Sequence, residues 1–204
     1  MLPFAHVGIA LGAAMLMARA VPHAASSERP GGHGGSAGAE PGSARDGWIP
    51  RLARCLEVRF LLVGSLLPDF IDKPVGTFLF RDTFGSGRIF CHTLLFTLVL
   101  AVPGVYLHLK RKGTWLAALA TGCFTHLVLD AMWLDARTLL WPLYGVTFER
   151  TDLEGWIPHI LDALVTKPNV FVPELVGLVV VTWFGWILVH RKTLRAFVRH
   201  GRIN

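Results

Sequence analysis

An uncharged apolar stretch, residues 89–109, limits what this chain can fold into more than any other feature. It contains no Asp, Glu, Lys or Arg, and about 20 such residues are enough for a helix to cross a bilayer. The whole chain of 204 residues has the same character, with 52% hydrophobic and 17% charged residues, whereas a soluble domain has about 25% charged residues. The sequence excludes a disordered chain, disfavours a soluble enzyme and indicates an integral membrane protein.

Four other segments are apolar enough to enter the membrane: residues 2–18, 51–67, 115–134 and 171–190. The second of these has a basic first half, so it can cross only if the basic side chains reach the surface or if it packs inside a bundle. Pro68 is expected to end that helix. We therefore predict an all-α, polytopic membrane bundle of about five transmembrane or membrane-embedded helices, in a single domain over residues 1–204.

Three segments are expected to lie outside this bundle. Residues 24–47 are rich in Gly, Ala, Ser and Pro and are predicted to form a flexible linker, because they offer no apolar face to a core. Residues 135–168 are predicted to form a polar loop with short interfacial helices, and residues 191–204 a basic cytoplasmic tail. In the first apolar segment, Gly8 and Gly12 have the spacing that lets a second helix approach closely.

Lysine and arginine are distributed unevenly between the two sides of the membrane. If all five segments cross, residues 19–59, 110–112 and 191–202 share one side and hold 14 of the 20 Lys and Arg residues, which leaves 6 for the other side. Cytoplasmic loops carry the excess of basic residues, so we expect an inner-membrane protein with its N-terminus outside and its C-terminus inside. The net charge of +6 is then a topology signal, and no nucleic-acid partner is expected.

His126 and Asp130 are the clearest sign of chemistry in the chain. They are four residues apart in a predicted helix, so their side chains point to the same side. An imidazole and a carboxylate on one face can hold a transition metal, most often Zn²⁺. The alternative is a buried histidine that is hydrogen-bonded to its neighbouring aspartate, but ionisable groups inside an apolar span are costly and mostly functional.

The predicted topology brings four more polar residues, His6, Asp69, Asp72 and His92, to the same outer face. Each has a plainer explanation when taken alone: the aspartates can cap a helix or a turn, and the histidines can be core or interfacial residues. Together they match the ligands of a mono- or dinuclear hydrolytic site, and the histidines disfavour an all-oxygen Ca²⁺ or Mg²⁺ site. We predict a divalent ion, zinc before other metals, with these ligands: His6, Asp69, His92, His126 and Asp130.

Other side chains are given supporting roles. Asp72 would act as a general base or bridge a second ion, and Arg88 would stabilise an anionic substrate or a developing negative charge. Glu174 is expected to support the cluster from the last apolar segment. Cys91 and Cys123 are expected to be small core residues, although a nucleophilic or metal-bound thiolate stays open.

The order of these motifs resembles that of the YdjM-like family of inner-membrane, metal-dependent hydrolases. The resemblance covers roughly residues 2–145 and is carried by the following features: His6 in a Gly-rich first helix, residues 67–72, Arg88 with His92, residues 122–130 and Trp141-Pro142-Leu143. The family typically has a His-Arg-Gly-x-Thr-His-Ser motif, in which Gly87 stands here at the first His. If that histidine is a ligand in the family, this chain has a poorer site or borrows another residue.

The resemblance and the ligand set together imply a membrane-bound metal-dependent hydrolase, with a metal ion and membrane lipid as partners. A water activated by the metal would attack a phosphoester or a lipid-like amphiphile; the order of His and Asp ligands is similar to that of zinc-dependent phospholipase C enzymes, which is an analogy. The alternative is a non-catalytic, metal-stabilised membrane module that binds a lipid or a protein. A small transporter is disfavoured, because its ionisable groups would be spread through the membrane depth.

The charge distribution predicts the outcome of reporter fusions. Fusions placed after Arg111 and after Arg202 should both report a cytoplasmic location, because both positions follow basic clusters on the same predicted side. A periplasmic signal at Arg111 would overturn the topology.

Overall fold

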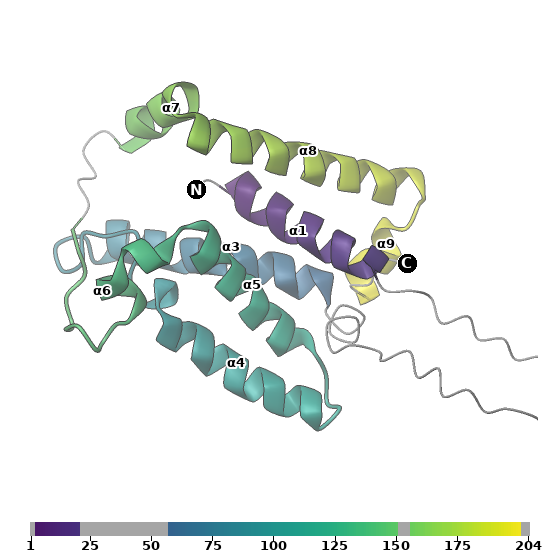
Figure 1. Cartoon of the computed structure of the whole chain (residues 1–204), viewed down its shortest axis with the longest axis horizontal. Helices are drawn as coiled ribbons and strands as arrows, with labels where there is room; N and C mark the ends of the chain where they lie inside the picture. Colours follow the sequence, from purple (N-terminus) through teal and green to yellow (C-terminus); the bar gives the residue numbers. More distant parts are fainter. Residues whose placement is uncertain (1–2, 21–56, 151–155, 201–204) are drawn as a thin grey trace, which may run out of the picture.

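The computed structural model describes residues 3–20, 57–150 and 156–200, and in this part of the chain every regular element is a helix (Figure 1). The long helices are α1 (Pro3–Ala20), α3 (Val58–Pro74), α4 (Leu94–Leu109), α5 (Trp115–Leu129) and α8 (Pro168–His190). The short elements are a π-helix η1 (Val75–Leu79), 3₁₀ turns η2 (Phe90–His92) and η3 (Met132–Leu134), α6 (Ala136–Leu139), α7 (Trp156–Thr166) and α9 (Leu194–His200). The all-α prediction is confirmed, and the linker predicted for residues 24–47 lies outside the described residues.

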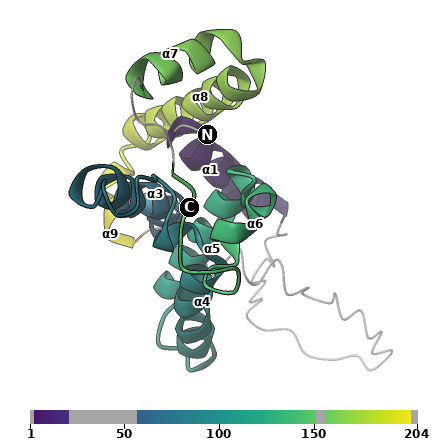
Figure 2. The same cartoon turned by 90° about the vertical axis from the view of Figure 1, so that its left-hand side faces the viewer.

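The five long helices lie side by side in the spatial order α8, α1, α3, α5 and α4 (Figures 1 and 2). Helix α3 packs on α5, α4 packs on the other side of α5, and α1 lies between α3 and α8. The first helix of the chain is therefore held from both sides by helices that come much later in the sequence. Residues of α1 are buried because this helix lies between α3 and α8.

One helix in the described part of the chain, α8, is long and apolar enough to cross a bilayer by itself. Three shorter apolar helices accompany it: Pro3–Leu16, Leu94–Leu109 and Trp115–Leu129. Of the about five membrane helices predicted, length and apolar composition thus support one, α8, and the polytopic bundle stays a prediction.

The prediction that Pro68 ends its helix is wrong. Helix α3 runs through Pro68 to Pro74 and continues as η1, so residues 58–79 form one helical stretch of 22 residues. A proline inside a helix removes a backbone hydrogen bond and costs about 3 kcal/mol. The helix continues because its buried face extends past the proline, with Ser65, Asp69 and Asp72 all turned into the interior.

The helices in the predicted segments 89–109 and 115–134 are shorter than the segments themselves. Helix α4 begins only at Leu94, where the Thr93 side chain accepts the backbone N–H of Phe96 at 3.1 Å as an N-cap. Helix α5 ends at Leu129, and Ala131 takes a left-handed conformation with φ 53° before η3. Residues on both sides of these two ends therefore sit in turns, where their backbone groups can reach into the interior.

Two close helix crossings depend on glycine. Gly8 of α1 faces Gly177 of α8, and a Cβ on either residue would collide with the backbone of the other helix. Gly122 of α5 faces α3, where a Cβ would lie 2.8 Å from the Ser65 backbone nitrogen. The prediction that Gly8 admits a second helix is confirmed, whereas Gly12 has room towards Val180. These crossings set how deeply α1 and α5 approach their neighbours.

The interior is apolar at one end and polar at the other. Leu11, Val58, Phe184 and Leu188 form a buried hydrophobic cluster. The fully buried polar side chains gather around the opposite end of α1: His6, Ser65, Asp72, His92 and His126. On the outside, α4 and α8 expose large apolar side chains along their length. A polar interior with an apolar exterior suits a molecule surrounded by lipid.

We expect Gly177→Ala to destabilise the protein and Gly185→Ala to leave it unchanged or slightly more stable. Both changes lie in α8 and gain the same helix propensity, but only Gly177 lacks space for a Cβ, since nothing lies within 4 Å of one at Gly185. Overpacking costs about 1–3 kcal/mol, so thermal unfolding in detergent should show a lower Tm for Gly177→Ala alone. Equal Tm values for the two variants would contradict the close α1–α8 contact.

Candidate metal centre

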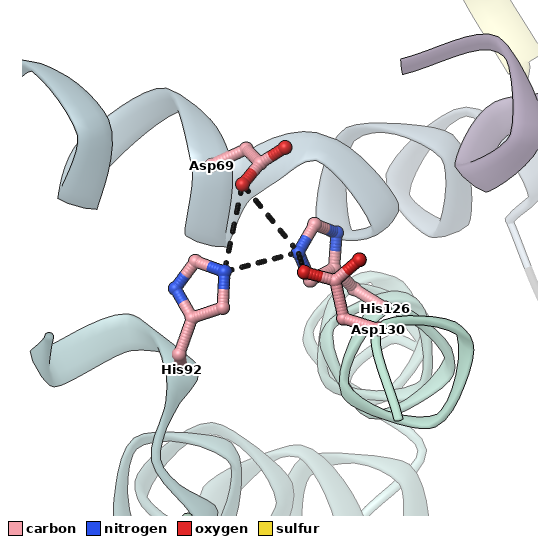
Figure 3. Close-up of side chains that lie close together, drawn as sticks. All are labelled: Asp69, His92, His126 and Asp130. Carbon is pink, nitrogen blue, oxygen red and sulfur yellow. Dashed lines mark hydrogen bonds and ion pairs between the residues drawn. The ribbon is translucent and has the colours of Figure 1, made fainter. Parts of the chain in front are cut away.

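Four side chains from separate parts of the chain meet beside the polar end of α1 (Figure 3). Asp69 comes from α3, His92 from η2 and His126 from α5, and Asp130 follows directly after α5. One donor atom from each residue lies within 4.8 Å of the others. Both imidazoles are completely buried, so the cluster is part of the interior.

The two histidines face each other through their Nε2 atoms, which are 3.2 Å apart. The Nδ1 atom of His126 lies 2.7 Å from the Ser65 carbonyl oxygen, and that of His92 lies 2.7 Å from a carboxylate oxygen of Asp72. Because a carbonyl and a carboxylate only accept hydrogen bonds, both Nδ1 atoms carry the proton. In the neutral rings, each Nε2 atom then presents a lone pair to the other. Two lone pairs at this distance repel unless a cation or a proton lies between them.

The turn that carries His92 favours positive charge. Burial lowers the pKa of His92, but the neighbouring carboxylates of Asp69 and Asp72 outweigh burial and raise the pKa above the ordinary value of a histidine. The carboxylates thus stabilise a cationic centre at this ring, which either a proton or a metal ion can supply.

The carboxylate oxygens complete the cluster at distances that suit a metal ion. Asp69 Oδ1 lies 3.5 Å from His92 Nε2 and 3.8 Å from His126 Nε2, and Asp130 Oδ2 lies 3.9 Å from His126 Nε2. Ligand atoms around one tetrahedral zinc ion are separated by about 3.3 Å when the bonds are near 2.0–2.1 Å. The donor types and their spacing therefore fit a divalent transition metal.

Asp72 is held by the turn before α4. Its carboxylate accepts the backbone N–H groups of Ile89 (2.9 Å), Cys91 (3.0 Å) and His92 (3.1 Å), in addition to the His92 ring. The side chain is fully buried, and one of its oxygens takes part in all four of these bonds. This geometry favours a role in orienting His92 over the predicted roles of general base or bridge to a second ion.

His6 lies beside the cluster. Its ring is stacked on that of His126 with centroids 4.0 Å apart and an angle of 18° between the planes. Its Nε2 atom lies 3.2 Å from Asp130 Oδ1, which makes an ion pair when the ring is protonated. Among the described residues, neither ring nitrogen of this buried side chain has a hydrogen-bond partner. The five predicted ligands are thus placed as a group of four with His6 on its border.

Two basic side chains border the acidic members of the cluster. Arg88, predicted to be near the site, bonds Asp130 Oδ2 through Nη2 at 3.0 Å. Lys73, which the sequence reasoning did not single out, bonds Asp69 Oδ2 at 2.6 Å. The spacing of four residues between Asp69 and Lys73 was the signal that could have identified it, but it is informative only if the helix continues through Pro68.

The remaining candidates are placed outside the cluster. Glu174 accepts the Phe4 backbone N–H at 3.1 Å, so it contacts the first turn of α1. Cys91 and Cys123 are buried, and burial, with Asp72 as a further cause, raises the pKa of the Cys91 thiol in the turn before α4. This favours a neutral thiol over a nucleophile. Gly87 contributes no donor, and the four-residue cluster forms without that position.

Comparison with known proteins identifies a family and no individual relative. The family model described as YdjM inner membrane protein matches residues 1–194, which confirms the family resemblance found in the sequence. Neither the search of curated proteins nor the search of solved structures found a match.

We expect Asp72→Asn to weaken metal binding by about 10- to 100-fold, the usual cost of losing the carboxylate that orients a histidine ligand. The amide nitrogen would face the backbone N–H groups that Asp72 now accepts, so the turn before α4 and the His92 ring would lose their orientation. Competition with a chromogenic chelator measures the metal affinity. Asp82→Asn, at an exposed position, is the matched control, and equal affinities of the two variants would contradict the role given to Asp72.

Proposed function

Because this chain belongs to the YdjM inner membrane protein family, we propose that it is a membrane-bound metal-dependent hydrolase. One observation carries the proposal: the Nε2 atoms of two buried histidines face each other at 3.2 Å, while both Nδ1 atoms lie 2.7 Å from hydrogen-bond acceptors. A shared cation satisfies both rings together, and donor atoms of Asp69 and Asp130 lie within 4.8 Å of donor nitrogens of both rings.

Three of the four donors are closest together and form the core of the proposed site. Asp69, His92 and His126 define a triangle with sides of 3.2, 3.5 and 3.8 Å (Figure 3). Two histidines and a carboxylate are the ligand set of many catalytic zinc sites, which keep one position open. A zinc-type ion held there would supply a Lewis acid and lower the pKa of a water molecule to about 7.

Asp130 is the residue that we propose as the proton acceptor. Its Oδ2 atom lies beside the triangle, 3.9 Å from His126 Nε2, and its side chain is held by Arg88 at 3.0 Å. Because those contacts do not depend on a metal bond, Asp130 can stay in place and accept a proton from a water at the site. Arg88 keeps the predicted role of stabilising negative charge.

We propose that the site lies at the outer side of the inner membrane. The N-terminus is then outside and the C-terminus inside, as the charge distribution predicts. The predicted segment 51–67 has the shortest apolar run of the five. The helix found there covers residues 58–79, and these 22 residues span about 33 Å at 1.5 Å per residue, which supports a crossing. The apolar exteriors of α4 and α8 support the remaining crossings. A site in this setting favours phosphoesters or other amphiphiles that come from the lipid phase.

One observation favours a second candidate function, a non-catalytic metal-stabilised module that binds a lipid or a protein. Four protein donors are gathered, and structural zinc sites are closed by four protein ligands. If Asp130 is a fourth ligand, no position is left for water. The two functions therefore differ in what Asp130 does.

Metal content and hydrolysis together test the proposal. Purified wild-type protein should hold about one zinc-type ion per chain by mass spectrometry of the metal, and His92→Ala and His126→Ala should lose it. His108→Ala is the matched control, because His108 lies in the last turn of α4, at the far end from the cluster. A wild type that retains no metal would overturn the proposal.

Asp130→Asn distinguishes the two candidate functions. As a hydrolase, the protein should cleave a bis(p-nitrophenyl) phosphate reporter, and Asp130→Asn should keep the metal while losing about 10²- to 10⁴-fold in rate. As a structural module, the wild type should show no cleavage, and both chelation and Asp130→Asn should lower its Tm.

A further inference from the structure

Lys73 and Arg88 form the border between the buried cluster and the outside. Each cation is bonded to one of the two cluster carboxylates: Lys73 Nζ to Asp69 Oδ2 at 2.6 Å, and Arg88 Nη2 to Asp130 Oδ2 at 3.0 Å. The carboxylates themselves are 11% and 4% exposed, whereas the Lys73 and Arg88 side chains are 34% and 46% exposed. A ligand that approaches the cluster from outside meets these two cations first.

The two cations belong to the same border. Gly87, the residue directly before Arg88, lies against the stem of Lys73, because a Cβ built on Gly87 would be 3.4 Å from Lys73 Cγ. A larger side chain at position 87 would compete with the lysine for this space. The loop that carries Arg88 therefore lies in contact with the side chain of Lys73.

The charges of these side chains leave the metal-loaded cluster positive. The cluster and its border contain three carboxylates, Asp69, Asp72 and Asp130, and two cations, Lys73 and Arg88. Lys73 is bonded to Asp69 and Arg88 to Asp130, whereas Asp72 is bonded to the His92 ring. With neutral histidines, these five side chains sum to one negative charge, and a divalent ion brings the sum to one positive charge. In a partly buried setting, uncompensated charge is costly, so the loaded site favours one further negative charge.

We propose that Lys73 and Arg88 form an anion-binding site beside the metal centre, whose occupant is the singly charged phosphate of a phosphodiester. The inference rests on the proposed function and adds to it a second binding residue and the charge of the substrate. A guanidinium presents a planar fork that fits two phosphate oxygens, and a lysine adds a point charge. A neutral ester would leave the positive charge unbalanced, and a doubly charged monoester would exceed it.

Phosphorus NMR on the wild type provides the first test. The protein in neutral detergent is loaded with paramagnetic Co²⁺, its metal content is measured, and dimethyl phosphate is added. We expect metal-dependent broadening of the dimethyl phosphate signal and none for uncharged trimethyl phosphate at the same concentration. Equal behaviour of the two compounds would overturn the inference, whatever the variants show.

Variants assign the binding to the two cations. Lys73→Gln and Arg88→Gln should each weaken dimethyl phosphate binding by about tenfold or more, the loss expected for one charge-assisted hydrogen bond. Lys110→Gln, an exposed lysine at the far end of α4, should bind like the wild type. Unchanged affinity in both cluster variants, with metal retained, would overturn the inference. If these variants lose the metal, the comparison of charged with uncharged phosphate in the wild type decides alone.

Two further readouts separate the possible outcomes. A wild type without metal overturns the proposed function, whereas a metal-loaded wild type that ignores dimethyl phosphate overturns only the anion site. A short-chain phosphatidylglycerol in the same micelles distinguishes the source of the phosphodiester: binding much tighter than that of dimethyl phosphate supports a lipid headgroup, and equal binding supports a small soluble ester.

Discussion

Two imidazole nitrogens that face each other at 3.2 Å are the constraint on which the rest of the structure depends. His92 and His126 come from elements 34 residues apart, and both rings are oriented by α3. The Ser65 carbonyl holds one Nδ1 atom and the Asp72 carboxylate holds the other. Because both Nδ1 atoms are bound to acceptors, the rings cannot turn their Nε2 atoms away from each other. A positive charge between these two atoms is therefore favoured. The carboxylates of Asp69 and Asp130 supply the compensating negative charge.

Close helix packing lowers the free-energy cost of such a polar interior. Charged and polar groups taken out of water are costly unless each has a partner, and partners come within reach only where backbones approach closely. Gly64 and Gly122 bring α3 against α5, and Gly8 and Gly177 bring α1 against α8. The first contact places Asp69 opposite His126, and the second fixes α1 so that His6 stacks on the same ring. The apolar side chains, in turn, are left to the outer surfaces of α4 and α8.

The role of Asp130 distinguishes a structural from a hydrolytic metal centre. It lies just past the end of α5, and its contacts with Arg88 and His6 do not require a metal bond. Lys73 holds Asp69 in the same way on the other side. Asp69 and Asp130 therefore each contact histidines inside and a cation at the border. This arrangement couples the metal centre to the charge of whatever binds outside.

The sequence by itself determined the helical character and the family, because these depend on composition, local periodicity and short motifs. The four-residue spacing of His126 and Asp130 correctly indicated that the two side chains lie close together, although Asp130 lies just past the end of α5. Tertiary structure alone decided which donors face inwards and what each one touches. Pro68 predicts a helix end locally, yet the hydrogen bonds of Asp72 with the turn before α4 and the ion pairs of Asp69 outweigh one missing backbone hydrogen bond. Asp72 became a support for His92, His6 a neighbour of the cluster and Lys73 a member of its border, because helix rotation and depth are set by contacts between residues far apart in the chain.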